Sequence, residues 1–372
     1  MAVPQTAVAP YQRLKDVDVV MTINHPREVI GLGNMLILNP TATLPSGLSD
    51  TLDNDERKDG ILSRKTDSAT GAVFREYSNL DAVAVDYDAD TAVYKKANSY
   101  FAQSEHSDRV AVLDYDPAKA YESLEAFWTF NWTFAILAES KVDDSAITLT
   151  NIFEANKDHF MVLQSNDLKD FDKLFGLNYT IALKHDVAEP MDAAFVGAIA
   201  NKEVGSTTWK FKELAGITPE SLTTQELAGI NNTHAIAYVR VSGHNRTSEG
   251  WTLSGEYIDS LHGILWVQTN IESSLEDSLQ SNDKIPYDNE GISLLRAKVT
   301  QVLQEAHERE IIATDDETGR GVYTVTAAPK SSQTKQDISK RHYEGLSFTF
   351  ETSSAVHSVT VHGTVDSDTI LV

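Results

Sequence analysis

Residues 257–279, YIDSLHGILWVQTNIESSLEDSL, and residues 285–308, IPYDNEGISLLRAKVTQVLQEAHE, carry the strongest structural signal in the chain. In both segments apolar side chains recur mostly three or four residues apart, which places them on one broad stripe of a helix. The stripe residues are Tyr257, Ile258, Leu261, Leu265, Ile271, Leu275 and Leu279 in the first segment and Ile292, Leu295, Val299, Val302 and Ala306 in the second. The sequence therefore predicts two long helices joined by a turn.

The segment before these helices, from residue 209 onward, predicts one short helix and one strand. Thr223 and Glu226 have the spacing of a capping box, in which each side chain accepts a hydrogen bond from the backbone of the other residue. Residues 235–241, AIAYVRV, are mainly β-branched, aromatic or small, and Ser242 and Gly243 follow them. This combination is typical of a strand that ends in a turn.

Upstream, from about residue 80, short apolar runs alternate with helical patterns. The runs predicted as strands are residues 81–87, 110–115, 133–138, 160–163 and 179–183, and helical stripes lie between them and after Pro190. This alternation is typical of an α/β layer whose sheet is mostly parallel and buried on both faces. The predicted fold class is α/β (α+β overall), with a central mostly parallel sheet and an α/β C-terminal domain that carries the two long helices.

Changes in composition along the chain suggest its domain boundaries. Residues 39–71 are rich in Asp, Ser, Thr, Gly and Lys, so we expect an exposed polar loop or a small insertion there. The predicted parts are an N-terminal arm at residues 1–23, an α/β domain at 24–205, a C-terminal core domain at 206–355 and a C-terminal arm at 356–372.

Both ends of the chain show the period-two alternation of β-strands. The apolar members are Val17, Val19, Met21 and Ile23 near the N-terminus, then Leu346, Phe348 and Phe350, and finally Val359, Val361 and Val365 near the C-terminus. An apolar terminal strand is a liability unless a sheet edge accepts it. We therefore expect extended β-strand arms at both termini that pair with a sheet edge of the same chain or of a neighbouring one.

The composition argues against several classes of partner. The chain has 372 residues, 31 Lys and Arg, 55 Asp and Glu, and a formal net charge of −24. Nucleic-acid binding and docking on an anionic membrane both need clustered basic residues, so neither is expected. The absence of cysteine removes disulfides and thiolate metal sites and fits assembly in a reducing cytoplasm. We expect neither a signal peptide nor a membrane span.

Candidate chemical motifs are incomplete. Gly31 and Gly33 begin a dinucleotide fingerprint, but its third glycine is missing and the chain has no phosphate loop. Residues 86–90, DYDAD, begin like a calcium loop but lack its glycine and its bidentate glutamate. Residues 114–117, DYDP, follow a predicted strand where an α/β sheet would contact a ligand, although a turn before a helix explains them equally well.

The histidines and aromatic residues favour packing over chemistry. His357 and His362 lie five residues apart on a predicted strand and so face opposite sides, which prevents them from sharing a metal. His262 lies in the first long helix, where we expect a packed or interfacial role. Residues 127–134 contain five aromatic side chains, FWTFNWTF, which we expect to be buried between two layers. No metal or cofactor is predicted.

Several C-terminal motifs resemble a known family. They are residues 248–251 (SEGW), 255–259 (GEYID), 262–263 (HG) with 266–267 (WV) after them, and 285–292 (IPYDNEGI). Together they resemble the core-domain signature of contractile phage tail sheath proteins, a family that includes the sheaths of tail-like bacteriocins and injection machines. The likeness is densest in this region and weaker upstream.

The resemblance implies a structural protein, not an enzyme, and one that needs no cofactor. Such a subunit would stack as hexameric rings around a tail tube and contract to drive the tube through the host envelope. Its partners would be other copies of itself, the tail tube protein, and the baseplate and tail terminator proteins, with no nucleic acid and no membrane. Its location would be the tail of a virion, after assembly in the host cytoplasm.

The resemblance also implies roles for particular segments. In sheath proteins the terminal arms complete a small β-sheet on neighbouring subunits, so the terminal valines, Met21 and Ile23 are candidate exchanged strands. Leu346, Phe348 and Phe350 would then belong to the receiving sheet. A helix at residues 288–308 would face the tube, with candidate contacts at Lys298, Glu305 and Glu308.

Two other interpretations remain open at this point. An α/β enzyme could assemble its site from dispersed carboxylates, which the sequence would not reveal. A tail tube protein or another non-contractile virion protein would share the acidic composition and the lack of motifs.

Overall fold

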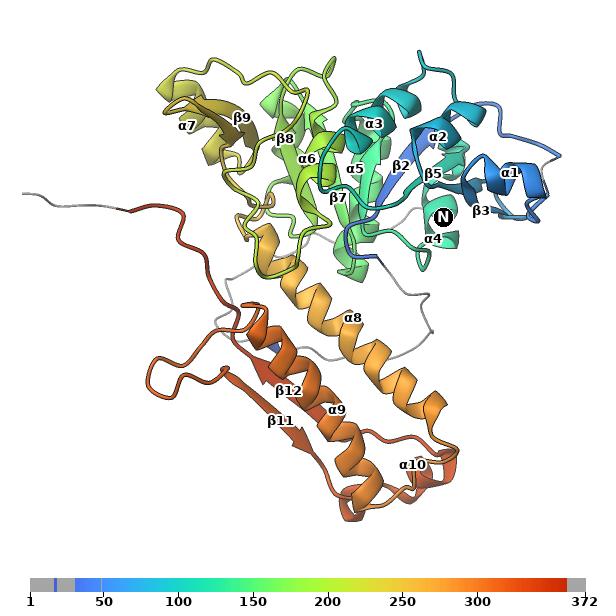
Figure 1. Ribbon diagram of the computed structural model, residues 1–372, viewed down its shortest axis with the longest axis vertical. Coiled ribbons are helices and arrows are strands. Elements are labelled where there is room, and N and C mark those ends of the chain that lie inside the picture. The colour runs from blue at the N-terminus through green and yellow to red at the C-terminus, as the bar shows by residue number, and fades with distance from the viewer. Residues whose placement is uncertain (1–16, 19–30, 48, 360–372) are drawn as a thin grey trace, which may run out of the picture.

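The computed structural model describes residues 17–18, 31–47 and 49–359, with side chains described from residue 31 onward. Figure 1 shows two parts, a sheet body and a stalk that extends away from it. The sheet body contains a large sheet covered by helices, and the stalk contains the two long helices and a small sheet. Among the helices of the described residues, none combines the length and apolarity needed to cross a bilayer.

The sheet body is built on nine strands whose central members run parallel. In spatial order they are β10 (His244–Thr247), β9 (Ile236–Val241), β8 (Thr180–Lys184), β7 (Phe160–Ser165), β6 (Phe134–Leu137), β2 (Met35–Pro40), β5 (Val110–Tyr115), β4 (Val73–Tyr77) and β3 (Ile61–Thr66). The strands from β9 to β5 are parallel, whereas β10, β4 and β3 add antiparallel edges. The predicted α/β fold with a mostly parallel sheet is confirmed.

Helices cover both faces of this sheet, as the apolar strands predicted. Met35 and Ile37 of β2 pack into one core, and the alternate residues Leu36 and Leu38 pack into the other. A strand that is buried on both faces must be apolar at every position, which explains the continuous apolar runs. The helices of the sheet body are α1 (Asn54–Lys58), α2 (Leu80–Asp86), α3 (Ala92–Phe101), α4 (Ala120–Ala126), α5 (Asp144–Asn156), α6 (Met191–Ile199), α7 (Thr224–Asn232) and the 3-10 helices η1 (Pro117–Lys119) and η2 (Leu168–Leu174).

One predicted strand is wrong, because residues 81–87 form most of helix α2. The side chain of Asn79 caps this helix by accepting a hydrogen bond from the amide of Ala82 at 2.9 Å. Ala82 and Val83 are buried against the sheet. A short run that alternates small and β-branched residues suits a strand and a helix equally well, and here the cap and the packing selected the helix.

The polar segment at residues 39–71 contributes to the sheet and is not only a loop. It contains α1 and β3, and β3 pairs with β4 at one edge of the sheet. Ile61 is 3% exposed, so the segment also contributes to the core. The sheet likewise continues past the boundary that we predicted after residue 205, since β9 lies parallel to β8.

The stalk consists of a helical hairpin packed on a three-stranded sheet. Its elements are α8 (Ile258–Ser281), α9 (Asn289–Glu308), β11 (Tyr323–Ala327), η3 (Lys330–Ser332), α10 (Lys335–Lys340), β12 (Leu346–Phe350) and β1 (Val17–Asp18). Asp288 caps α9 by accepting hydrogen bonds from the amides of Glu290 and Gly291, both at 3.0 Å. The two long helices are therefore confirmed with bounds close to the predicted ones.

Helix α8 belongs to both parts of the molecule. Leu261 and Leu265, near its start, are buried in a core of the sheet body. Trp266 and Ile271, farther along, are buried in the separate core of the stalk, where α9 and the small sheet pack on them. One continuous helix that is packed into two cores holds the sheet body and the stalk in a defined relative position.

His262 lies on α8 at this junction and is 3% exposed. Its Nε2 donates a hydrogen bond to the backbone carbonyl of Leu32 at 2.8 Å, which links α8 to the loop that enters β2. Burial lowers the pKa of His262 from 6.5 to about 4, because the charged ring would lose its hydration. The expectation of a packed histidine is confirmed.

Two glycines allow close packing where the stalk meets the sheet body. Gly205 has φ of +97°, and a Cβ there would lie 2.2 Å from the carbonyl oxygen of Arg309. Gly263 lies on α8, where a Cβ would approach Cγ2 of Ile311 to 2.9 Å. At Gly205 the positive φ and the backbone neighbour both require glycine.

We predict that the buried His262 makes the free energy of unfolding fall as the pH drops from 7 to 4. In this range the unfolded chain binds a proton at pKa 6.5 that the folded chain, with a pKa of about 4, does not bind. The free energy of unfolding therefore rises with pH. Between a pH below both pKa values and a pH above both, His262 changes it by about 3 kcal/mol. Chemical denaturation at several pH values should show that the free energy of unfolding changes less with pH in His262→Gln than in the wild type. The exposed control His244→Gln should behave as wild type, and an unchanged slope in His262→Gln would contradict the assignment.

We also predict that Gly205→Ala lowers the free energy of unfolding by about 2 kcal/mol or more, because it adds a backbone clash to a strained φ. The matched control is Gly216→Ala, which has φ of +76° but open space around the new Cβ. Gly216→Ala should lower the free energy of unfolding by about 1 kcal/mol, because it adds backbone strain without a clash. Equal losses for both variants in denaturant titrations would show that the contact with Arg309 is unimportant.

Candidate assembly surfaces

The carboxyl ends of the parallel strands, where an open α/β sheet usually binds its ligand, are closed by internal pairing. Asp114 at the end of β5 is 2% exposed. Its carboxylate pairs with Arg75 and accepts hydrogen bonds from the Tyr87 hydroxyl at 2.7 Å and from Nδ2 of Asn39 at 2.6 Å. Burial, reinforced by the Asp114 carboxylate, raises the pKa of Tyr87 well above its usual value, so its hydroxyl remains a donor. These groups neutralise one another within the chain.

The incomplete calcium and turn motifs have structural roles. Asp86 accepts a hydrogen bond from the Tyr77 hydroxyl at 2.7 Å and pairs with Arg75 at 3.1 Å. Asp116 caps η1 by accepting from the amide of Ala118 at 2.9 Å. Within the described parts of the chain, no group of three or more His, Asp or Glu side chains is placed to hold a metal ion.

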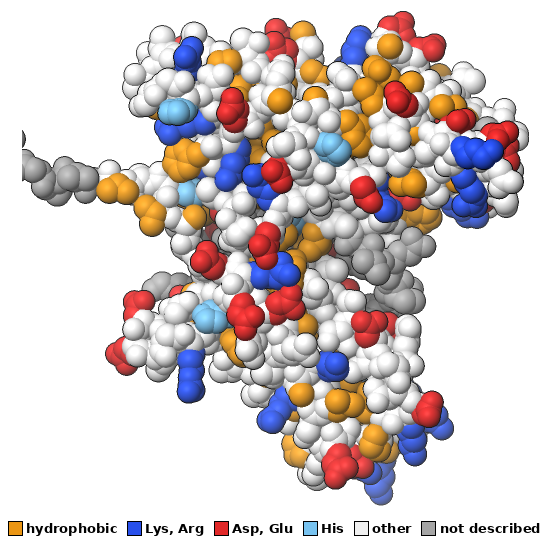
Figure 2. Space-filling view, in the orientation of Figure 1, with side chains coloured by type: hydrophobic (Ala, Val, Ile, Leu, Met, Phe, Trp, Pro, Cys, Tyr) orange, Lys and Arg blue, Asp and Glu red, His pale blue; other side chains and the backbone are white. Residues whose placement is uncertain are grey.

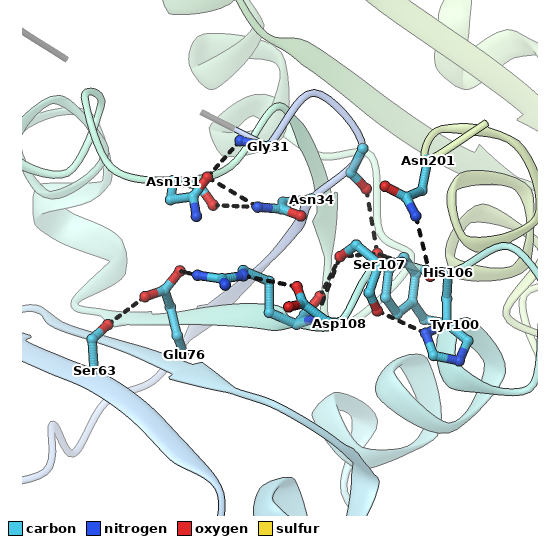
Figure 3. Close-up of polar contacts among 12 residues, drawn as sticks. Gly31, Asn34, Ser63, Glu76, Tyr100, His106, Ser107, Asp108, Asn131 and Asn201 are labelled. Carbon is cyan, nitrogen blue, oxygen red and sulfur yellow. Dashed lines mark hydrogen bonds and ion pairs between the residues drawn. The ribbon is translucent and has the colours of Figure 1, made fainter. Parts of the chain in front are cut away.

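The glycine motif at Gly31 and Gly33 lies before β2 and not after it, so it is not arranged as a dinucleotide loop. Figure 3 shows Asn131 between Gly31 and Asn34, with its side-chain oxygen accepting from the Gly31 amide at 2.6 Å and from Nδ2 of Asn34 at 3.0 Å. A Cβ at Gly33 would lie 2.5 Å from Cα of Asn201. The motif therefore packs the chain tightly where it enters the sheet.

Four of the five aromatic side chains at residues 127–134 are buried as predicted, whereas Phe130 is half-buried at the margin of the core. Phe127, Trp132 and Phe134 are at most 2% exposed, and Trp128 is 7% exposed. Nε1 of Trp128 donates to Asp158 at 3.0 Å, and Nε1 of Trp132 donates to the Phe127 carbonyl at 2.9 Å. Both indole donors are satisfied internally, so the run does not form an exposed stacking platform.

The stalk sheet brings together chain segments that are far apart in sequence. Strand β12 lies in the middle, with β1 on one side and β11 on the other, and both pairs are antiparallel. Val17 lies opposite Phe350 on one side of β12, and Tyr323 lies opposite Phe350 on the other. In the single chain the N-terminal segment thus occupies an edge of its own β12.

The two faces of this sheet differ in character. Phe348 and Phe350 are 6% and 3% exposed and pack into the stalk core, and Leu346 packs at its margin. On the opposite face hydroxyl groups pair across the strands, Thr324 with Thr349 at 2.7 Å and Thr326 with Ser347 at 2.6 Å. With one face buried and one face polar, further association would have to use the strand edges.

The predicted arm residues are described only in part. Val19, Met21, Ile23, Val361 and Val365 lie outside the described residues, and so does His362. Val359 is 77% exposed at the end of the described chain. The assignment of these residues to exchanged strands stays a prediction.

The predicted tube-facing residues lie on α9. Glu305 and Glu308 are exposed and Lys298 is half-buried. Glu308 accepts a hydrogen bond from Nε2 of Gln304 at 3.1 Å, and Glu305 accepts one from Nε of Arg309 at 3.1 Å. These side chains border a polar hollow of about 550 Å³ lined by Glu203, Gln301, Gln304, Glu305, Glu308 and Arg309.

Arg309 joins the stalk to the sheet body beside this hollow. Its guanidinium pairs with Glu203 at 2.9 Å and with Glu305 at 3.0 Å, and lies 5.0 Å from the centre of the Trp266 ring. Figure 2 shows acidic side chains gathered around a basic one where the two parts meet. Sequence reasoning missed Arg309, because Glu305 is its local i,i+4 partner but Glu203 and Trp266 come from two distant segments that no local pattern marks.

Comparisons with known proteins agree with the resemblance described above. Residues 258–365 match the family model described as "E217 tail sheath protein gp31-like, C-terminal domain". This range covers α8, α9 and the described strands β11 and β12 of the stalk. No curated protein sequence matches the chain.

Solved structures resemble the chain over most of its length. A chain of the anti-feeding prophage (AFP) baseplate has 12% identity and a TM-score of 0.64, covering 99% of this chain and 100% of its own. A chain of the contracted sheath complex of an extracellular contractile injection system, PVC, has 11% identity and a TM-score of 0.63, covering 97% and 99%. The sheath tail protein Lin1278 from Listeria innocua has 12% identity and a TM-score of 0.50, covering 88% and 94%.

At these identities the structural likeness concerns the fold, whereas the family model concerns the stalk sequence itself. The two comparisons agree on one architecture. The resemblance to contractile tail sheath proteins is thereby confirmed: residues 258–365 match the model of a tail sheath C-terminal domain, and the chain is similar in fold to solved sheath proteins over most of its length.

Proposed function

We propose that this protein is the structural subunit of a contractile tail sheath, which polymerises around a tail tube and contracts to drive the tube through the host envelope. The observation that carries the proposal is the tail sheath domain at residues 258–365, within a chain that has the sheath fold over nearly its whole length. The closed carboxyl edge of the main sheet supports a scaffold role over an enzymatic one.

Strand exchange between copies is the proposed basis of polymerisation. Strand β11 has an edge with no paired strand among the described residues, and β12 is flanked on its other side by the two residues of β1. An extended segment can add to such an edge through backbone hydrogen bonds, while alternate side chains set the register. The segments with Val17, Val19, Met21 and Ile23, and with Val359, Val361 and Val365, supply the added strands.

An exchange of this kind produces an open assembly. The donated strand and the receiving sheet of Leu346, Phe348 and Phe350 are different surfaces, so the contact is heterologous and continues from copy to copy. Because the exchanged strands would link neighbouring bodies, those bodies could change their packing while they remain linked. In the isolated chain, β1 would occupy the edge that a neighbour's strand takes in the polymer.

Contraction needs no nucleotide in this proposal. The subunit would pass from a metastable packing to a more stable one, released at the baseplate, with each copy moving largely as a rigid unit. Burial of apolar surface in the new packing contributes roughly 25 cal/mol per Å². Repetition over many copies turns a small gain per subunit into a large total.

In this proposal, helix α9 faces the tail tube. Its exposed carboxylates Glu305 and Glu308 and the adjoining hollow present a mainly acidic surface, which fits a tube protein with basic groups on its outer wall. Baseplate and tail terminator proteins would bind the two ends of the sheath. The protein would assemble in the host cytoplasm and reside in the tail of a virion or tail-like particle.

We predict that the apolar face of the C-terminal arm is required for assembly. Electron microscopy of the purified protein should show helical tubes or ring stacks, and these should be lost on deletion of residues 356–372 or on changing Val359, Val361 and Val365 to Ser. The control changes the intervening Thr360, His362 and Thr364 to Ser and should still assemble. The substitution variants should unfold at the wild-type temperature, because the changed positions follow His357 and leave its contacts with the sheet body in place. Tubes formed equally well after deletion would contradict strand exchange.

We further predict that Glu308→Lys weakens binding of the sheath subunit to its tube several-fold at low salt. A lysine suits the last turn of α9, so folding should be unaffected. The matched control Glu317→Lys makes the same charge change at an exposed position outside α9. The difference between the variants should shrink at high salt because exposed charges are screened. Equal tube binding by both variants in a co-sedimentation assay would remove α9 from the tube interface.

A further inference from the structure

The chain that follows β12 does not leave the molecule directly from the stalk. Thr352 bridges to Ile312, and the amide of Ser353 donates to the Ile311 carbonyl at 2.9 Å. Residues 354–356 are exposed and carry the chain up to the sheet body. Figure 1 shows this segment rising beside the top of the stalk and then turning outward at the level of the sheet body.

His357 contacts the sheet body at the point where the chain turns outward. Its Nε2 lies 2.8 Å from Oγ1 of Thr208, a residue 149 positions earlier in the sequence. Its ring meets the Tyr257 ring nearly edge-on, with centroids 4.7 Å apart, and lies 6.2 Å from the Phe211 ring. His357 is half-buried, whereas Val356 and Val359 are each 77% exposed.

The wall made by Phe211 has an unusual backbone. Phe211 has φ of +67°, which is costly for a bulky residue and calls for an explanation. Its amide donates to the Thr247 carbonyl at 3.2 Å, and its ring is flanked by the charged groups of Lys210 at 5.1 Å and Arg246 at 4.9 Å. These contacts hold the ring at the surface beside His357, although the ring stays 40% exposed.

Asp259 completes the polar side of this site. Burial raises the pKa of the Asp259 carboxyl group above its usual value, and interactions with Thr208 and His357 oppose this rise. Thr208 and Asp259 therefore offer polar partners, while Tyr257 and Phe211 offer ring surfaces. The imidazole of His357 therefore has both polar and aromatic neighbours in this site.

We propose that His357 is a positioning residue that docks the root of the C-terminal arm in a socket formed by Thr208, Phe211, Tyr257 and Asp259. The inference deepens the proposed sheath function and rests on it, because the arm is the strand that a neighbouring copy receives. Docking makes the arm depart from the sheet body, with a set direction, and not from the stalk. Release of His357 would free residues 354–357, which adds about 13 Å of reach to the arm.

Such a socket accounts for both the strained Phe211 and the isolated contact of His357 between exposed valines. A fixed departure point reduces the conformations that the arm must give up when it pairs with a neighbour. A releasable contact also lets the arm lengthen if neighbouring bodies move apart. The contacts are few and half-exposed, so release should be easy.

The test measures docking in the unassembled, full-length protein. The chain has no cysteine, so Ser358→Cys and the exposed Lys95→Cys can carry a pair of spin labels without background. Double electron–electron resonance should give one narrow distance distribution in the otherwise wild-type chain. Both His357→Ala and Thr208→Val, which removes the hydroxyl and keeps the shape, should broaden it. The control Val356→Ser should leave it unchanged.

A broad distribution in the wild-type background, or one that neither variant alters, would overturn the socket. Electron microscopy of the same variants then tests its role, with several-fold fewer tubes expected for His357→Ala at equal protein concentration. Tube numbers equal to wild type would overturn the positioning role. Failure of the wild type to form tubes would instead count against the sheath function, while the resonance result would still report on docking.

Discussion

The structure depends on one helix that is buried in two cores. The first turns of α8 pack under the main sheet through Leu261 and Leu265, and the following turns pack in the stalk through Trp266 and Ile271. A hinge in this region would expose apolar side chains from both cores, so the helix resists bending. His262 and Arg309 add polar links across the same junction, to Leu32 and Glu203. The sheet body and the stalk are thereby held together as one unit.

The carboxyl end of strand β5 in the sheet body is occupied by internal ion pairs and hydrogen bonds. The parallel strands of the sheet body end in polar residues, as in ligand-binding α/β proteins, but those residues pair internally around Asp114 and Arg75. A second buried pair, Lys96 with Asp192 at 2.6 Å, joins helix α3 to helix α6. Buried pairs of this kind cost desolvation and demand good geometry, so they favour one arrangement of the surrounding elements.

The features that we propose for assembly lie at the ends of the chain. The stalk sheet already combines residue 17 with residue 350, and its polar face and buried face leave only the edges for growth. The described C-terminal segment leaves the molecule from a defined point, where Nε2 of His357 lies 2.8 Å from Oγ1 of Thr208. A defined starting point of this kind would suit the proposed exchange of strands between copies.

Local patterns were sufficient for much of this architecture. The apolar stripes of α8 and α9, the capping box at Thr223 and the buried strands were predictable because spacing and caps act within a few residues. Strand β4 was missed because its Arg75 and Glu76 look like surface residues until partners from β5, β3 and the chain before β5 neutralise them. Residues 81–87 were wrongly predicted as a strand because a short apolar run fits both states until packing selects one. The pairing of β1 with β12, the Arg309 link and the His357 socket join residues far apart in sequence, so they exist only once the cores have brought those segments together.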